Sequence, residues 1–140
     1  MLKNYQLPTV ERDLWQQLAV EECPLVIYGM GNGADKLIAR LAAIGKAPAA
    51  IFASDDFVRG QSFHGFRVCR FSAIKERFSD FVMLVSFGSR LPAVMDALFD
   101  MAEKYPLYLP DMPVAGEVDF TYRFYQENEE KIRQVYDLLA

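Results

Sequence analysis

The stretch that decides the fold is Leu25-Val26-Ile27-Tyr28-Gly29-Met30-Gly31-Asn32-Gly33-Ala34. Its apolar first four residues predict a strand that is buried on both faces of a sheet. The spacing of Gly29, Gly31 and Ala34 follows the pattern G-x-G-x-x-G/A of turns that bind dinucleotides. In such turns the first glycine allows a tight bend, the second admits a phosphate, and the small third residue lets helix and strand pack closely. The alternative is a glycine turn in an α/β domain that binds nothing.

A helix is expected to follow this turn, with Asn32 as its N-cap. The free N–H groups at such a helix start favour an anion. The sequence therefore predicts a phosphate-binding turn, and its candidate residues are Gly29, Gly31, Asn32, Gly33 and Ala34.

Beyond the turn, apolar residues recur at helical spacing from Leu37 to Ile44, and Gly45 suits the end of the helix. A second strand is predicted over residues 49–53, which gives a βαβ unit with parallel strands. Asp55 lies 21 positions after Ala34. A dinucleotide site needs a carboxylate about 20 residues past the glycines, to accept from a ribose hydroxyl. Asp55 is the first candidate and Asp56 the second, and the alternative is a polar turn.

Alternation of apolar strands and amphipathic helices continues to residue 109. It predicts a three-layer α/β sandwich of the Rossmann-like type, with about five mainly parallel strands in the order 3-2-1-4-5. Gly88 and Ser89 follow the fourth strand and are expected to form the opposite wall of the ligand crevice; Ser89 as an N-cap is the alternative. The three later strands are predicted at 66–70, 81–87 and 107–109, with helices at 72–78 and 89–104.

Both ends of the chain carry further helical patterns. Residues 1–23 are expected to contain a helix that starts after Thr9, without a capping box, and residues 119–140 a final helix. The final helix has no stop signal, which indicates that the single domain 1–140 was cut from a longer protein. His64, the sole histidine, is expected to be a surface residue rather than a base.

Composition narrows the class of protein. The chain has 140 residues, 52% of them hydrophobic, and a formal net charge of -4. These values suit one globular domain and argue against a nucleic-acid partner, because no basic block is present. The two cysteines, Cys23 and Cys69, lack the spacing of metal ligands and are expected to be reduced. Neither a signal peptide nor a membrane-spanning run is evident, so a cytoplasmic location without a membrane partner is expected.

One resemblance is carried by six segments: 28–36, 52–61, 63–68, 87–89, 108–113 and 128–139. Together they resemble the Rossmann-like N-terminal region of FkbM-type methyltransferase proteins. The resemblance implies that the last helix connects to a C-terminal catalytic domain that uses S-adenosylmethionine and lies beyond residue 140. The first half also looks like the nucleotide-sugar-binding domains that precede some sugar acyltransferases.

The leading hypothesis is a non-catalytic accessory domain that binds a nucleotide or a nucleotide-sugar. One alternative is an enzyme domain that uses Gly29-x-Gly31-x-Gly33 for S-adenosylmethionine or NAD, although no catalytic residue can be assigned in this chain. Another is a degenerate Rossmann-like domain used for assembly, for example as a homodimer, with the aromatic residues 120–125 at its interface.

Overall fold

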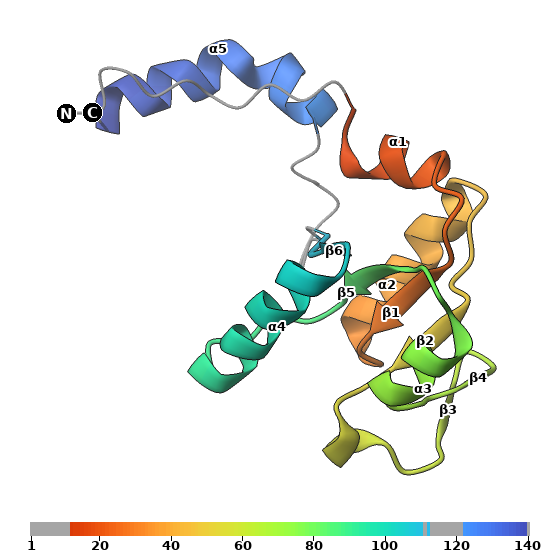
Figure 1. Cartoon of the computed structure of the whole chain (residues 1–140). Helices are drawn as coiled ribbons and strands as arrows, with labels where there is room; N and C mark the ends of the chain where they lie inside the picture. The colour runs from red at the N-terminus through yellow and green to blue at the C-terminus, as the bar shows by residue number, and fades with distance from the viewer. Residues whose placement is uncertain (1–11, 111, 113–121, 140) are drawn as a thin grey trace.

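The computed structural model describes residues 12–110, 112 and 122–139 of the chain. Its main sheet contains β1 (Leu25–Tyr28), β2 (Ala50–Phe52), β5 (Val82–Val85) and β6 (Leu107–Tyr108). The strands lie in the order β2-β1-β5-β6 and every pair is parallel, with Ile27 opposite both Ile51 and Leu84. The predicted α/β class and the parallel βαβ unit are therefore confirmed (Figure 1).

Helices pack against both faces of this sheet (Figure 1). Side chains alternate along β1: Leu25 and Ile27 point toward one face, Val26 and Tyr28 toward the other, and all four are buried. The predicted strand with two covered faces is thus confirmed. The described helices are α1 (Leu14–Ala19), α2 (Asn32–Ala43), α3 (Phe71–Arg77), α4 (Pro92–Lys104) and α5 (Tyr122–Leu139), with a 3₁₀ turn, η1 (Asp55–Phe57).

The two faces of the sheet have cores of different chemistry. The face under α2 is mainly aliphatic, and Leu37 and Leu41 of that helix are fully buried there. The face under α3 and α4 contains Ile74 and Leu98 and a chain of aromatic rings. Tyr28 stacks on Phe52 with 4.6 Å between ring centroids, and Phe52 lies 5.2 Å from Phe71. Tyr28 and Phe52 are the last residues of β1 and β2, so the aromatic core extends to the carboxyl ends of these strands.

The predicted five-strand order 3-2-1-4-5 is not confirmed as a whole: the four strands of the sheet keep the relative order 2-1-4-5, but residues 66–70 do not form a full fifth strand. Residues 62–67 instead form a separate antiparallel hairpin of β3 (Ser62–Phe63) and β4 (Phe66–Arg67). Only Cys69, through an isolated parallel bridge to Phe52, reaches the main sheet. His64 and Gly65 at the hairpin tip both have positive φ, 48° and 79°, as a tight two-residue hairpin turn requires. Because β4 pairs with β3, only the Cys69 bridge remains beside β2, where the third predicted strand would lie.

Several predicted helix ends are also wrong. The N-cap of α2 is Gly31 and not Asn32, which is the first helical residue. Ser89 does not cap α4, because that helix begins only at Pro92, with Leu91 as its N-cap. Ser72 lies inside α3, whose N-cap is Arg70. The three starts share a feature: none has a side-chain cap hydrogen bond, so the usual cap residues gave a misleading signal.

The predicted end of α2 is confirmed. Gly45 has φ 75°, its N–H donates to Ala42 O at 3.0 Å, and the N–H of Lys46 donates to Leu41 O at 2.9 Å. These two bonds are those of a Schellman motif, which needs a residue in the left-handed conformation at this position.

The N-terminal helix is shorter than predicted. It begins at Leu14, with Asp13 as N-cap, whereas Thr9 lies outside the described residues. A capping box is present after all: Gln16 N donates to Asp13 Oδ1 at 2.8 Å, and Asp13 N to Gln16 Oε1 at 3.0 Å. The expected absence of such a box followed from placing the cap four residues too early.

The last helix, α5, is continuous from Tyr122, and no described residue in it is buried. Of the predicted segment 119–140, residues 119–121 and 140 lie outside the described part. Two i,i+4 ion pairs, Arg123–Glu127 and Arg133–Glu129, support its solvent-exposed side. Across the described residues, each helix is too short or too polar to pass through a lipid bilayer.

Candidate functional site

The glycine-rich turn follows β1 directly and has the tight geometry expected of it. Gly29 has φ 117°, a region that side-chain-bearing residues rarely adopt, and its N–H donates to Phe52 O at 2.9 Å. Gly31 then starts α2 by accepting from Ala34 N at 3.0 Å and from Asp35 N at 3.1 Å. The turn therefore connects the carboxyl end of β1 to the start of α2 within three residues.

Ser86, the residue after β5, occupies the space between the ends of β1 and β5. Its backbone N–H and its hydroxyl both donate to Tyr28 O, at 3.0 and 2.9 Å. The ring of Phe87 meets Tyr28 edge to face, with 4.8 Å between centroids. The crevice predicted over Gly29, between the first and fourth predicted strands, is thus lined closely by protein groups.

Gly33 is the glycine that lets α2 approach β5. A Cβ atom placed on Gly33 would lie 1.9 Å from the carbonyl oxygen of Ser86, far inside van der Waals contact. A Cβ atom on Gly31, in contrast, would meet nothing within 4 Å. Close helix–strand packing, which the pattern assigned to Ala34, depends on Gly33 as well, while Ala34 is fully buried under the helix.

A pocket of about 460 Å³ opens beside this contact, at the carboxyl ends of β5 and β6. The first two residues of α2 form one side of it, and their backbone N–H groups have no acceptor among the described residues. Its lining residues are Asn32, Gly33, Lys36, Val85, Ser86, Phe87, Gly88, Leu109, Pro110 and Met112.

The two sides of the pocket differ in chemistry. The α2 side offers backbone N–H groups, the positive end of the helix dipole and the ammonium group of Lys36. The opposite side, after β6, offers the apolar side chains of Leu109, Pro110 and Met112. The pocket can therefore accommodate an anionic group at one end and an apolar or planar group at the other.

The sequence-predicted site residues fall into two groups. Asn32, Gly33 and Gly88 line the pocket, whereas Gly29, Gly31, Ala34 and Ser89 lie near it in sequence and do not. Ser89 instead accepts from Leu91 N at 3.2 Å.

Asp55 and Asp56 form the second group, away from the pocket. They begin η1 after β2, and β1 separates β2 from β5 in the sheet. Both carboxylates are exposed, and neither lines the pocket. Their predicted role at a ribose stays a prediction.

Lys36 is a site residue that the sequence analysis missed. It lies four positions after Asn32, so the two side chains share one face of α2. A lysine one turn beyond a glycine-rich helix start was the available signal. The apolar wall at residues 109–112 had no comparable signal, because only the fold brings it beside α2.

His64 and Asp35 meet beside the glycine turn. His64 Nε2, at the tip of the β3–β4 hairpin, is bonded to Asp35 Oδ1 in the first turn of α2. Both side chains are about half exposed, which agrees with the expected surface position of His64. The sequence separation of 29 residues hid the pair from pattern analysis.

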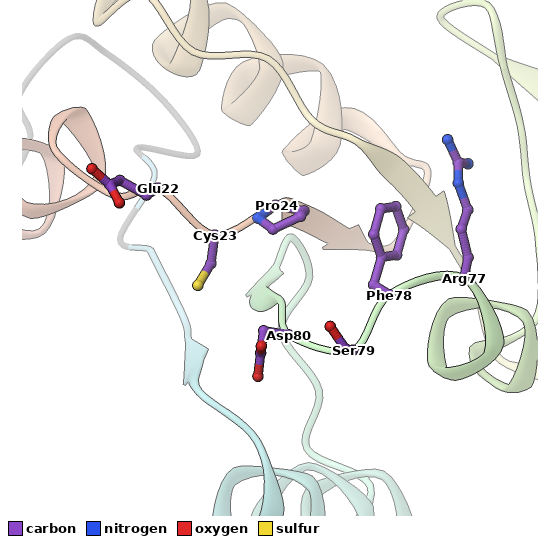
Figure 2. Close-up of a pocket in the computed structure, with 7 residues that line it drawn as sticks. All are labelled: Glu22, Cys23, Pro24, Arg77, Phe78, Ser79 and Asp80. Atoms are coloured by element: carbon purple, nitrogen blue, oxygen red, sulfur yellow. The ribbon is translucent and has the colours of Figure 1, made fainter.

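A second pocket, of about 370 Å³, lies at the amino ends of the strands, beside the residues that precede β1 and β5 (Figure 2). Cys23 and Asp80 line one end of this pocket, and Arg77 and Phe78 line the other end (Figure 2). Desolvation and the nearby acids, Glu21 first, raise the pKa of the Cys23 thiol, which keeps it protonated and weakly nucleophilic. Arg77 supplies a cation here, but it lies at the C-terminal end of α3, so this pocket has no helix start among its lining residues.

The first pocket is thus the stronger candidate, since it combines backbone donors, a cation and an apolar wall. Within the part of the chain that is described, no cluster of three or more His, Cys, Asp or Glu side chains could hold a metal ion. Among protein-family models, curated proteins and solved structures, none matches this chain.

Proposed function

We propose that this chain is a non-catalytic module that binds a nucleotide or nucleotide-sugar in the pocket beside the start of α2. One observation carries the proposal: the pocket joins the ammonium of Lys36 and the N–H groups of Asn32 and Gly33, which have no acceptor among the described residues, to an apolar wall. A phosphate would accept from the N–H groups and pair with Lys36. The base or sugar would then lie along Leu109 and Met112.

The position of the pocket agrees with this proposal. In open parallel sheets, ligands bind beyond the carboxyl ends of the strands, and the pocket lies beyond those of β5 and β6. A volume of about 460 Å³ is within the range of small-molecule sites. In the full protein the module would be Rossmann-like and would precede an FkbM-type methyltransferase domain, as the sequence resemblance implies.

A second candidate function, assembly without a ligand, is favoured by Ser86. Its side chain and backbone fill the space beside Gly29, between the carboxyl ends of β1 and β5, although the space over Gly31, which the pattern assigns to phosphate, is open. Use of the same turn for NAD or S-adenosylmethionine is less well supported, since Asp55 and Asp56 lie away from the pocket.

Thermal denaturation with a ligand panel tests the proposal. The panel is UDP-glucose, other nucleotide-sugars, NAD, coenzyme A and S-adenosylmethionine, each at several concentrations. A ligand at one hundred times its Kd stabilises the native state by about 2.7 kcal/mol, which for a domain of this size raises Tm by several degrees. A nucleotide-sugar should give the largest shift, and a flat response across the whole panel would favour the assembly function.

Three variants then locate the ligand by titration calorimetry. Lys36→Met should weaken binding about tenfold, because it removes the cation and keeps an aliphatic side chain, whereas Lys75→Met, on α3, should not. Gly31→Val should leave the fold intact, since its side chain enters open space, and should weaken binding if the phosphate lies over the turn. Asp55→Ala separates two positions of the ribose: a loss of about 1–3 kcal/mol would place it at this carboxylate, as the sequence predicts, whereas unchanged affinity is expected if it lies along Leu109 and Met112.

A further inference from the structure

The β3–β4 hairpin lies against the helix start that borders the proposed site. Phe63 and Phe66 pack on the aliphatic core, which anchors the hairpin at its base. Beside them, Gln61 Nε2 donates to Phe57 O at 2.6 Å and contacts Met30 Sδ at 3.3 Å, which ties the hairpin to the glycine turn. The tip reaches farther, to the first turn of α2, through His64.

Asp35, the residue that His64 contacts, has two opposing electrostatic effects. A carboxylate in the first turn of a helix stabilises the helix, because it faces the positive end of the dipole. The same charge repels any anion that approaches the free N–H groups of Asn32 and Gly33. A ring N–H of His64 that donates to Asp35 would reduce this repulsion, most strongly when the imidazole is charged.

We propose that the His64–Asp35 pair is a clasp that holds the hairpin on α2 and screens the Asp35 charge from an anion bound at the helix start. The holding part of the clasp stands on the contacts alone. The screening part rests on the proposed function. His64 has the positive φ, 48°, that the two-residue turn requires, so the same residue forms the turn and the contact with Asp35.

The turn itself supplies a sharp test variant. Asn tolerates positive φ, and Asn-Gly is the sequence that favours this two-residue turn most. His64→Asn therefore keeps or improves the hairpin turn while it removes the imidazole. Asp35→Asn removes the charge from the other side of the same contact, and the double variant completes a mutant cycle.

Hydrogen exchange of the full chain tests the holding role without any ligand. The Val68 N–H, bonded to Gln61 O at 3.0 Å, and the other hairpin amides should exchange about 1.5- to fivefold faster in either single variant. The double variant should show no further increase, and amides of β1 and β5 should be unchanged. Hairpin amides that exchange no faster in His64→Asn than in the parent chain would overturn the clasp.

Titration with UDP-glucose tests the screening role. His64→Asn should weaken binding about two- to fivefold, because the Asp35 charge is then uncovered, whereas Asp35→Asn should not weaken it. Equal weakening in both variants would mean that the contact only positions the hairpin, and screening would be rejected. If UDP-glucose does not bind the parent chain, the same titrations use the panel ligand that raises Tm most. A flat panel would reject the proposed function and the screening role together, while hydrogen exchange still decides the holding role.

Discussion

Replacing Gly33 by alanine should loosen the domain at the contact between α2 and β5. The added Cβ would lie 1.9 Å from Ser86 O, and real Cβ contacts are not closer than 3.0 Å, so one of the two backbones must move by about 1.1 Å. Neither partner is a flexible side chain. Ser86 is fixed by two hydrogen bonds to Tyr28 O, and α2 by Ala34, Leu37 and Leu41, which are fully buried.

The free energy of unfolding should decrease because this movement opens a gap under α2. A separation of 0.5–1 Å forfeits about a quarter to a half of the dispersion energy between packed atoms. Overpacked sites of this kind typically lose about 1–3 kcal/mol, and the better helix propensity of alanine returns less than about 1 kcal/mol. We expect a net loss of about 2 kcal/mol, which for this chain length lowers Tm by roughly 6 °C.

Gly31→Ala is the matched control, two residues away in the same turn. Its Cβ meets nothing within 4 Å, and φ at Gly31 is -106°, which alanine adopts freely. The control should lose only about 0.5 kcal/mol, from the poorer N-cap. Urea unfolding followed by the fluorescence of Trp15, the sole tryptophan, which packs on the aliphatic core, measures both variants. A midpoint for Gly33→Ala equal to or above that of Gly31→Ala would refute the packing argument.

Three further predictions concern a helix cap, a carboxylate and a thiol. Asp13→Ala should lower the free energy of unfolding by about 1 kcal/mol, since it removes the capping box of α1, and an unchanged urea midpoint would contradict this. The Cys23 N–H donates to the Glu21 carboxylate and lowers the pKa of this carboxyl below its usual 4.5. The ionised carboxylate therefore stabilises the fold above pH 4.5, and this stabilisation is lost as the pH falls through the lowered pKa. The Tm difference between the parent chain and Glu21→Gln should accordingly shrink on acidification, and a constant difference would count against the assignment. Burial raises the pKa of the Cys69 thiol, so iodoacetamide at neutral pH should modify it much more slowly in the native chain than in urea, whereas equal rates would argue against that environment.

The sequence predicted the centre of the fold because its signals there are local. The apolar run before Gly29 and the left-handed Gly45 each determine their own structure through side-chain burial and backbone conformation. Strand ends were predicted too long, for example 81–87 in place of Val82–Val85, since apolar residues continue past the paired part of the strand. Phe81 and Phe87 belong to the aromatic core without lying in β5.

The site was harder to predict because its parts come together only in the fold. The glycine pattern correctly placed a helix start beside the sheet edge, but it could not show that Ser86 approaches Gly33. The spacing of Asp55 from the glycines suited a ribose contact, yet a count along the chain does not fix the direction of a side chain after the strand. The wall at Leu109 and Met112 lies more than 70 residues from Asn32, and nothing in local sequence links them.

The same glycines can serve packing, binding or both, and their individual environments separate these roles. Two of them have a structural reason to be glycine: Gly29 has a positive φ, and a side chain on Gly33 would clash with the backbone of Ser86. Gly31 has neither constraint: its φ is ordinary and the space above it is open. A side chain there would cost the fold little beyond the N-cap preference for glycine, so a loss of ligand affinity in a Gly31 variant would not come from a disturbed fold. Of the three glycines, Gly31 is therefore the one whose substitution reports on binding with the least disturbance of the fold.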